Sequence, residues 1–233
     1  MKLVVFGDSF PNGLNKPSPE SPVNNSIEQQ QKINFVTRIG QLLEIEVENY
    51  SARGAGNPEI AYRAFDYVRN NACTDAMLLV VWSSFNRPYT INPLNGQRSG
   101  VFDIPDKALE VLQDQMIYAV YGLCIEKKIP LLMTNSFCQP EKTHLELNFL
   151  DSFDRSAYIE YGKPCNTLMD ICYGVWLQNY EYPVHTFDHN YRTQELPDTL
   201  SPCWHPNERG HRLIAETLAP YIAQKINIHY ESR

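Results

Sequence analysis

The chain has 233 residues, of which 43% are hydrophobic and 20% are charged, and its formal net charge at pH 7 is −7. That length suffices for one well-cored α/β domain, and the composition is typical of a folded globular protein, which excludes a disordered or low-complexity chain. The acidic balance and the lack of a clustered Lys and Arg run argue against nucleic acid or an anionic membrane as the partner. We therefore expect a small-molecule or neutral partner.

The start of the chain and the cysteines bear on compartment and cofactors. Met1 and Lys2 lead directly into the first apolar run, which leaves no room for a signal peptide, and no apolar run approaches the length of a membrane span. A cytoplasmic or virion-associated location is expected. The six cysteines form no CxxC pair, so neither a disulfide framework nor a zinc site is predicted. His185 and His189 have one-turn helical spacing, but their neighbours look strand-like, and we predict no metal and no cofactor.

Apolar runs predict the strands of a sheet. The runs Leu3–Phe6 and Ala76–Trp82 are apolar throughout, as expected of central strands that are covered on both faces. Residues 45–48 alternate between apolar and charged, which favours an edge strand with one buried face. Further strands are expected over 129–133 and 184–187.

Helical patterns occur between these runs. A capping-box pattern at 26–29 precedes four apolar residues on one helical face, which predicts one helix; they are Phe35, Ile39, Leu42 and Leu43. Asn57 stands before Pro58, a pattern typical of a helix cap. A long helix is expected over 105–127 and a final one after Pro206.

Strands that alternate with helices predict an α/β fold of three layers, α/β/α, around a flavodoxin-like parallel sheet with right-handed crossovers. We expect a single domain over 1–233, with an irregular, aromatic-rich insertion or lid around 138–201. Ser9, Gly54 and Asn86 follow the first three expected strands. Because the carboxyl ends of parallel strands share one edge of the sheet, these residues should meet there.

Those residues fit nucleophilic catalysis by serine. Ser9 would be the nucleophile and His205, just before the final helix, the base. The oxyanion would be held by the backbone N–H groups of Ser9 and Gly54 and by the side-chain amide of Asn86. Gly54 permits a close backbone approach because it has no side chain. His211, in contrast, is interpreted as a surface histidine.

Four short blocks resemble those of the SGNH, or GDSL, hydrolase family. They are Gly7-Asp8-Ser9-Phe10, Asn49 with Gly54, Ser84-Phe85-Asn86-Arg87, and His205-Pro206-Asn207 with Gly210-His211. The resemblance spans nearly the whole chain. It implies a flavodoxin-like α/β/α fold, no cofactor, and hydrolysis of esters or thioesters on lipids, sugars or small acyl compounds.

The chain departs from the family pattern at two places. Ser84 and Arg87 replace the usual Gly and Asp of the third block. Pro202 stands where the family motif DxxH has the aspartate that orients the histidine. Carboxylates close to it in sequence are Asp188, Glu195 and Asp198, and a backbone carbonyl is a further alternative; Asp198 is the candidate that we test as the third catalytic residue.

These observations leave several functions open. The leading hypothesis is a serine esterase or deacylase that acts on an O-acylated carbohydrate or similar small ester. Arg53 and Arg87 flank the oxyanion donors and would contact an anionic substrate group, or would be solvated. The alternative is a catalytically weak or inactive carbohydrate-binding or virion-associated module, prompted by Pro202. A nucleotide-binding protein is disfavoured, because Glu59 occupies the third glycine position of GxGxxG. The sequence does not indicate an oligomeric state.

Overall fold

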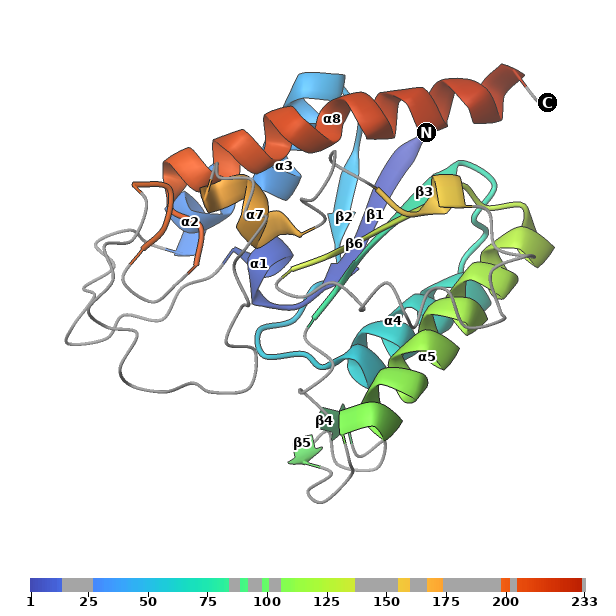
Figure 1. The fold of residues 1–233 in the computed structure, drawn as a ribbon. Helices are drawn as coiled ribbons and strands as arrows, with labels where there is room; N and C mark the ends of the chain where they lie inside the picture. The colour runs from blue at the N-terminus through green and yellow to red at the C-terminus, as the bar shows by residue number, and fades with distance from the viewer. Residues whose placement is uncertain are drawn as a thin grey trace.

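The centre of the fold is a parallel sheet of four strands in the order β2-β1-β3-β6 (Figure 1). The structure is a computed structural model, and it describes residues 1–13, 27–83, 89–91, 98–100, 106–136, 155–159, 167–173, 198–201 and 205–231. The strands are β1 (Lys2–Gly7), β2 (Val47–Asn49), β3 (Ala76–Trp82) and β6 (Leu131–Asn135). All three pairings are parallel, so the predicted flavodoxin-like order is confirmed.

Burial follows the apolar patterns of the strands. Every residue of β3 is buried, and so are the last five of β1, because helices cover both faces of the sheet. β2 lies at the edge and is partly exposed, as its alternating sequence predicts. The outer side of β6 carries isolated parallel bridges to Tyr158 and Thr167. A separate antiparallel pair is formed by β4 (Tyr89–Ile91) and β5 (Arg98–Gly100).

Two layers of helices enclose the sheet (Figure 1). One face packs against α4 (Asn57–Asn70) and α5 (Asp106–Lys127), which meet alternate strand residues such as Val80. The other face packs against α3 (Phe35–Leu43), α7 (Leu168–Tyr173) and α8 (Glu208–Glu231). The remaining short helices are α1 (Ser9–Asn12), α2 (Ile27–Ile33) and the 3-10 turn η2 (Arg155–Ala157). The expected α/β/α architecture is confirmed.

Three details differ from the sequence prediction. The single helix expected from residue 26 to Leu43 is two helices, because Asn34 interrupts it and caps α3 by accepting a hydrogen bond from Val36 N. Leu42 is 54% exposed and does not join the core. Asn57 is not the cap of α4, since Gly56 holds that position and makes no side-chain cap.

Some predictions fall outside the described residues. The expected strand at 184–187 lies there, as does most of the expected insertion at 138–201. Of that insertion, 155–159, 167–173 and 198–201 are described. Within the described ranges, no helix is long and apolar enough to cross a membrane.

Candidate active site

Ser9 is the first residue of α1, the one-turn helix that begins where β1 ends. The first N–H groups of a helix have no intrahelical acceptor, which leaves the Ser9 amide directed away from the turn. Asp8 caps the helix by accepting a hydrogen bond from Phe10 N, and Gly13 ends it with a left-handed φ of 69°. Ser9 itself is 4% exposed. A serine at the carboxyl edge of a central strand is therefore held on a short, well-defined turn.

Three asparagines hold α1 in place. The carbonyl oxygen of Pro11 accepts hydrogen bonds from the side-chain amides of Asn34 and Asn49, each at 2.7 Å. Asn12 donates in turn to Ser51 O at 2.8 Å. The carbonyls at the end of a helix have no intrahelical donor, so these side chains satisfy one of them. They also connect the turn that carries Ser9 to the start of α3 and to the segment after β2.

Asp8 links the ends of three strands. Its carboxylate is 0% exposed and accepts hydrogen bonds from Ser83 Oγ and Ser136 Oγ, both at 2.9 Å. Ser83 directly follows β3, and Ser136 directly follows β6. A buried carboxylate requires several donors to offset its desolvation, and these two hydroxyls and Phe10 N supply them. The residue before Ser9 is thus fixed to the ends of β3 and β6, the two strands on one side of β1.

Asn57 provides a second connection at this edge. Its side chain donates to Ser83 O at 3.2 Å and accepts from Ser83 N at 2.8 Å. This pairing explains why Asn57 does not cap α4. The side chain replaces a strand partner for Ser83 and fixes the point where β3 ends.

His205 lies against Ser9. Its Nε2 is 2.8 Å from Ser9 Oγ, and its ring contacts the Phe10 ring with centroids 5.6 Å apart. The ring is partly buried. The distance is that of a hydrogen bond, and it is the geometry that a serine nucleophile and its base require.

The loop that carries His205 is tied to the start of α8. Ser201 N donates to His205 O, and Asn207 N donates to Thr199 O. The Asn207 side chain caps α8 by accepting from Arg209 N and Gly210 N. A Cβ on Gly210 would lie 2.3 Å from Thr199 O, so only glycine permits this approach of two backbones.

Gly54 lies in a tight turn after β2. Its φ is 69°, a left-handed value that favours glycine, and Ala55 N donates to Ala52 O across the turn. The segment is anchored to β1 because Ala52 N donates to Gly7 O at 2.9 Å. Within the described residues, neither the Gly54 amide nor the Arg53 guanidinium has a hydrogen-bond or ion-pair partner. Gly54 therefore presents an unused donor on a segment fixed beside Gly7.

The structure does not bring Asp198 to His205. The Asp198 side chain is 68% exposed, and its Oδ2 pairs with the exposed Arg209, the second residue of α8. No hydrogen bond joins the Asp198 carboxylate to His205 in the part of the chain that is described. This geometry does not support Asp198 as the third catalytic residue. Asn86, Arg87 and Pro202 lie outside the described residues, as do the other two carboxylates considered, Asp188 and Glu195.

His211 is buried, contrary to the surface position expected for it. It is 2% exposed, its ring stacks on Phe35, and its Nδ1 accepts a hydrogen bond from Phe35 N at 3.4 Å. Burial, with the nearby charges of Arg38 and His205, lowers the pKa of His211 to about 3. A neutral histidine is thereby kept as an acceptor at the start of α3, and it has a structural position instead of a catalytic one.

Metal binding has no support in the described ranges. No group of three His, Cys, Asp or Glu side chains lies close enough there to hold an ion. His185 and His189 fall outside these ranges.

Similarity to known proteins is found in the fold. No protein-family model and no curated protein sequence matches the chain. The structure aligns over 94% of its length with 98% of a Desulfitobacterium hafniense protein described as lipolytic and of the G-D-S-L family, at 15% identity and a TM-score of 0.52. It aligns over 97% with 66% of a Corynascus thermopiles carbohydrate esterase family 2 enzyme (14% identity, TM-score 0.54). It also aligns over 97% of its length with 64% of an acetyl xylan esterase from Butyrivibrio proteoclasticus, at 13% identity and a TM-score of 0.53.

The chain therefore has the fold of SGNH/GDSL lipolytic proteins and esterases. The residues that hold the site together are not marked as such in the sequence. Asp8, Asn34 and Asn57 act through partners that are distant in sequence, and only the Gly-Asp-Ser spacing pointed to one of them.

Proposed function

We propose that the protein is a serine esterase or deacylase that forms an acyl-serine intermediate. The observation that carries this proposal is the 2.8 Å separation between Ser9 Oγ and His205 Nε2. It is supported by the position of Ser9 at the start of a helix, where a backbone N–H is available to a developing negative charge.

In the proposed reaction, His205 Nε2 takes the hydroxyl proton as Ser9 Oγ attacks the ester carbonyl carbon. The resulting oxyanion accepts hydrogen bonds from the N–H groups of Ser9 and Gly54, and from the side-chain amide of Asn86. Collapse breaks the bond to the alcohol, which leaves with the proton from His205. Water then attacks the acyl-serine with the same base, giving the carboxylic acid and free Ser9.

The third catalytic position requires a separate test. If Asp198 orients His205, its carboxylate must leave Arg209, and Asp198→Asn should lower kcat strongly; replacing the orienting Asp of a serine protease by Asn costs about 10⁴ in kcat. The exposed pairing with Arg209 instead leads us to expect a change of about twofold or less. Arg209→Gln is the matched control, because it frees Asp198 without altering it.

The substrate class that we propose is an O-acylated carbohydrate or a similar small ester. Several of the proteins with the same fold are described as carbohydrate or acetyl xylan esterases. Arg53 is half-buried beside Gly54 and would contact an anionic group of the substrate, with Arg87 as a second candidate. If so, Arg53→Gln will raise KM for an ester that carries a carboxylate and leave KM for a neutral ester unchanged.

The alternative, a weak or inactive binding module, is favoured by Pro202 in place of the DxxH aspartate and by the pairing of Asp198 with Arg209. A serine-directed fluorophosphonate separates the two, since it reacts only with an activated hydroxyl. We expect one phosphonyl group per chain, on the peptide that contains Ser9, and no reaction with His205→Asn. If the fluorophosphonate labels no serine of the intact wild-type protein, the esterase proposal is refuted.

A further inference from the structure

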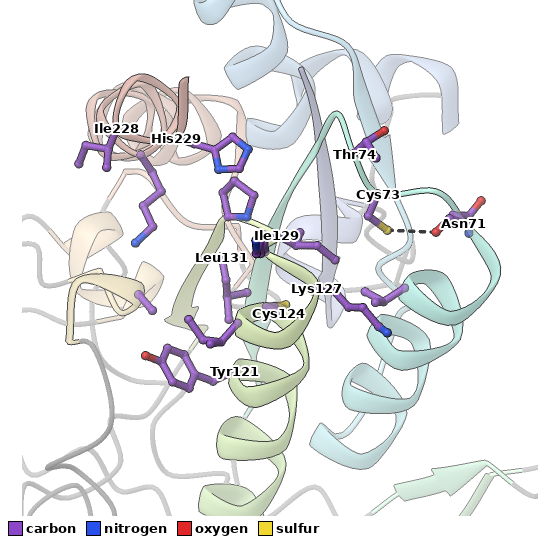
Figure 2. Close-up of a pocket in the computed structure, with 16 residues that line it drawn as sticks. Asn71, Cys73, Thr74, Tyr121, Cys124, Lys127, Ile129, Leu131, Ile228 and His229 are labelled. Carbon is purple, nitrogen blue, oxygen red and sulfur yellow. Dashed lines mark hydrogen bonds between the residues drawn. The ribbon is translucent and has the colours of Figure 1, made fainter. Parts of the chain in front are cut away.

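A concave feature lies at the edge of the sheet opposite Ser9. It is formed by the segments that lead into β3 and β6 and by the end of α8 (Figure 2). Since the strands are parallel, these amino ends are remote from the carboxyl ends that carry Asp8 and Ser9. The volume is about 700 Å³, within the range of small-molecule sites in proteins.

The floor of this pocket is apolar. Cys124, Ile129 and Leu131 lie in its centre in Figure 2, and each is at most 5% exposed. The walls carry two apolar side chains that remain in solvent: Ile125 is 59% exposed and Ile228 is 53% exposed. Removing such surface from water is worth about 25 cal/mol for each Å², so an apolar ligand would be favoured here.

The charged side chains that line the pocket are all lysines. Lys127, Lys128 and Lys225 line it, and none of its sixteen lining residues is Asp or Glu. Lys225 Nζ donates to Ser156 Oγ at 3.1 Å, and Lys127 forms an exposed ion pair with Glu126. Exposed pairs of that kind contribute little and are readily exchanged. In a chain with a net charge of −7, a pocket lined by lysines and by no carboxylate favours an anion.

We propose that the pocket binds a free alkyl carboxylate, with its chain against Cys124, Ile129 and Leu131 and its carboxylate at the border, beside one of the lysines. The apolar floor is concave, which suits a single alkyl chain, whereas binding to a membrane surface would need no concavity. The lysines lie at the border of this floor. The site is independent of Ser9 and of the proposed esterase activity.

Calorimetric titration of the full chain with octanoate, octanol and acetate tests the chemistry. Octanoate should bind saturably and acetate should not, because acetate lacks the apolar chain. The double variant Lys127→Gln/Lys225→Gln should bind octanoate about three- to tenfold more weakly and octanol unchanged. Lys32→Gln, an exposed lysine on α2, is the control and should match the wild type.

Ile228→Glu tests the wall. It should weaken both octanoate and octanol, whereas Leu42→Glu, a similarly exposed apolar residue on α3, should weaken neither. A diazirine derivative of octanoate should label peptides from 121–131 or 225–231. Labelling confined to the Ser9 and His205 peptides, equal octanoate affinity in the double variant, or binding only to anionic vesicles would overturn the proposal.

Discussion

The strongest structural prediction concerns the Asp8 carboxylate, which connects α1 to the ends of β3 and β6. It is fully buried and accepts from Phe10 N at 3.0 Å and from Ser83 Oγ and Ser136 Oγ at 2.9 Å. Hydrogen bonds to a charged group contribute about 1.5–3 kcal/mol each, and a buried donor left without a partner costs about 1–3 kcal/mol. Part of this is offset because the variant no longer buries a carboxylate.

We therefore expect Asp8→Ala to lower the free energy of unfolding by about 3–5 kcal/mol and to lower kcat through displacement of Ser9. Asp8→Asn should cost only about 1–2 kcal/mol. The amide oxygen can still accept from Phe10 N and Ser136 Oγ, and Ser83 Oγ can accept a hydrogen bond from the new amide. Urea denaturation followed by circular dichroism measures both. Asp66→Ala removes an exposed carboxylate that accepts from Asn70, and it should change stability by about 0.5 kcal/mol or less.

A combined variant makes the reasoning refutable. Asp8→Ala with Ser83→Ala and Ser136→Ala removes the unpaired hydroxyls along with the carboxylate. Its loss of stability should be smaller than the sum of the three single losses by about 1–3 kcal/mol. Strict additivity, or an Asp8→Ala loss below about 1 kcal/mol, would show that the carboxylate does not hold these strands together.

Two further predictions concern the loop and helix that carry His205. Gly210→Ala should destabilise by about 1–3 kcal/mol and reduce activity, because its Cβ would meet Thr199 O at 2.3 Å; Gly122→Ala, on α5 with nothing within 4 Å, should instead stabilise by about 0.5–1 kcal/mol. Chemical denaturation compares the two, and equal effects would contradict the close approach. His211 has a pKa lowered from 6.5 to about 3, so between these values the unfolded chain binds a proton that the folded chain does not. The stability that neutral His211 contributes is fully present above about pH 6.5. Between about pH 6.5 and pH 3 it declines by about 1.4 kcal/mol for each pH unit that the pH falls. His211→Gln should show a correspondingly shallower loss of stability from pH 6.5 to 4.5, and an unchanged slope would contradict the neutral, buried assignment.

The elements that sequence patterns predicted well are those with one dominant cause. The apolar runs that became β1 and β3 cannot be solvated on either face, so their central positions follow from composition alone. Ser9, Gly54 and His205 are candidate site residues because short blocks keep them next to Gly or Pro residues with fixed backbone roles. Among these, the contact of Ser9 with His205 was expected and is present at 2.8 Å.

What sequence patterns could not predict depends on long-range partners. Asp8 meets hydroxyls that are 75 and 128 positions away, and no local signal marks Ser83 or Ser136. Asn34 interrupts a stretch whose apolar periodicity continues across it, so the cap was hidden by the pattern. The burial of His211 was hidden in the same way. The sequence pattern of α8 allows His211 to face either solvent or the core, and the stacking of its ring on Phe35 decides that it is buried.

The most direct test of the central claim is the initial rate on p-nitrophenyl acetate and butyrate for wild type, Ser9→Ala and His205→Ala. The proposed mechanism predicts turnover by the wild type and background rates for both variants, with melting temperatures that show all three proteins to be folded. A wild type that hydrolyses neither ester faster than Ser9→Ala, or a Ser9→Ala variant that retains the wild-type rate, would contradict the claim that Ser9 is the nucleophile.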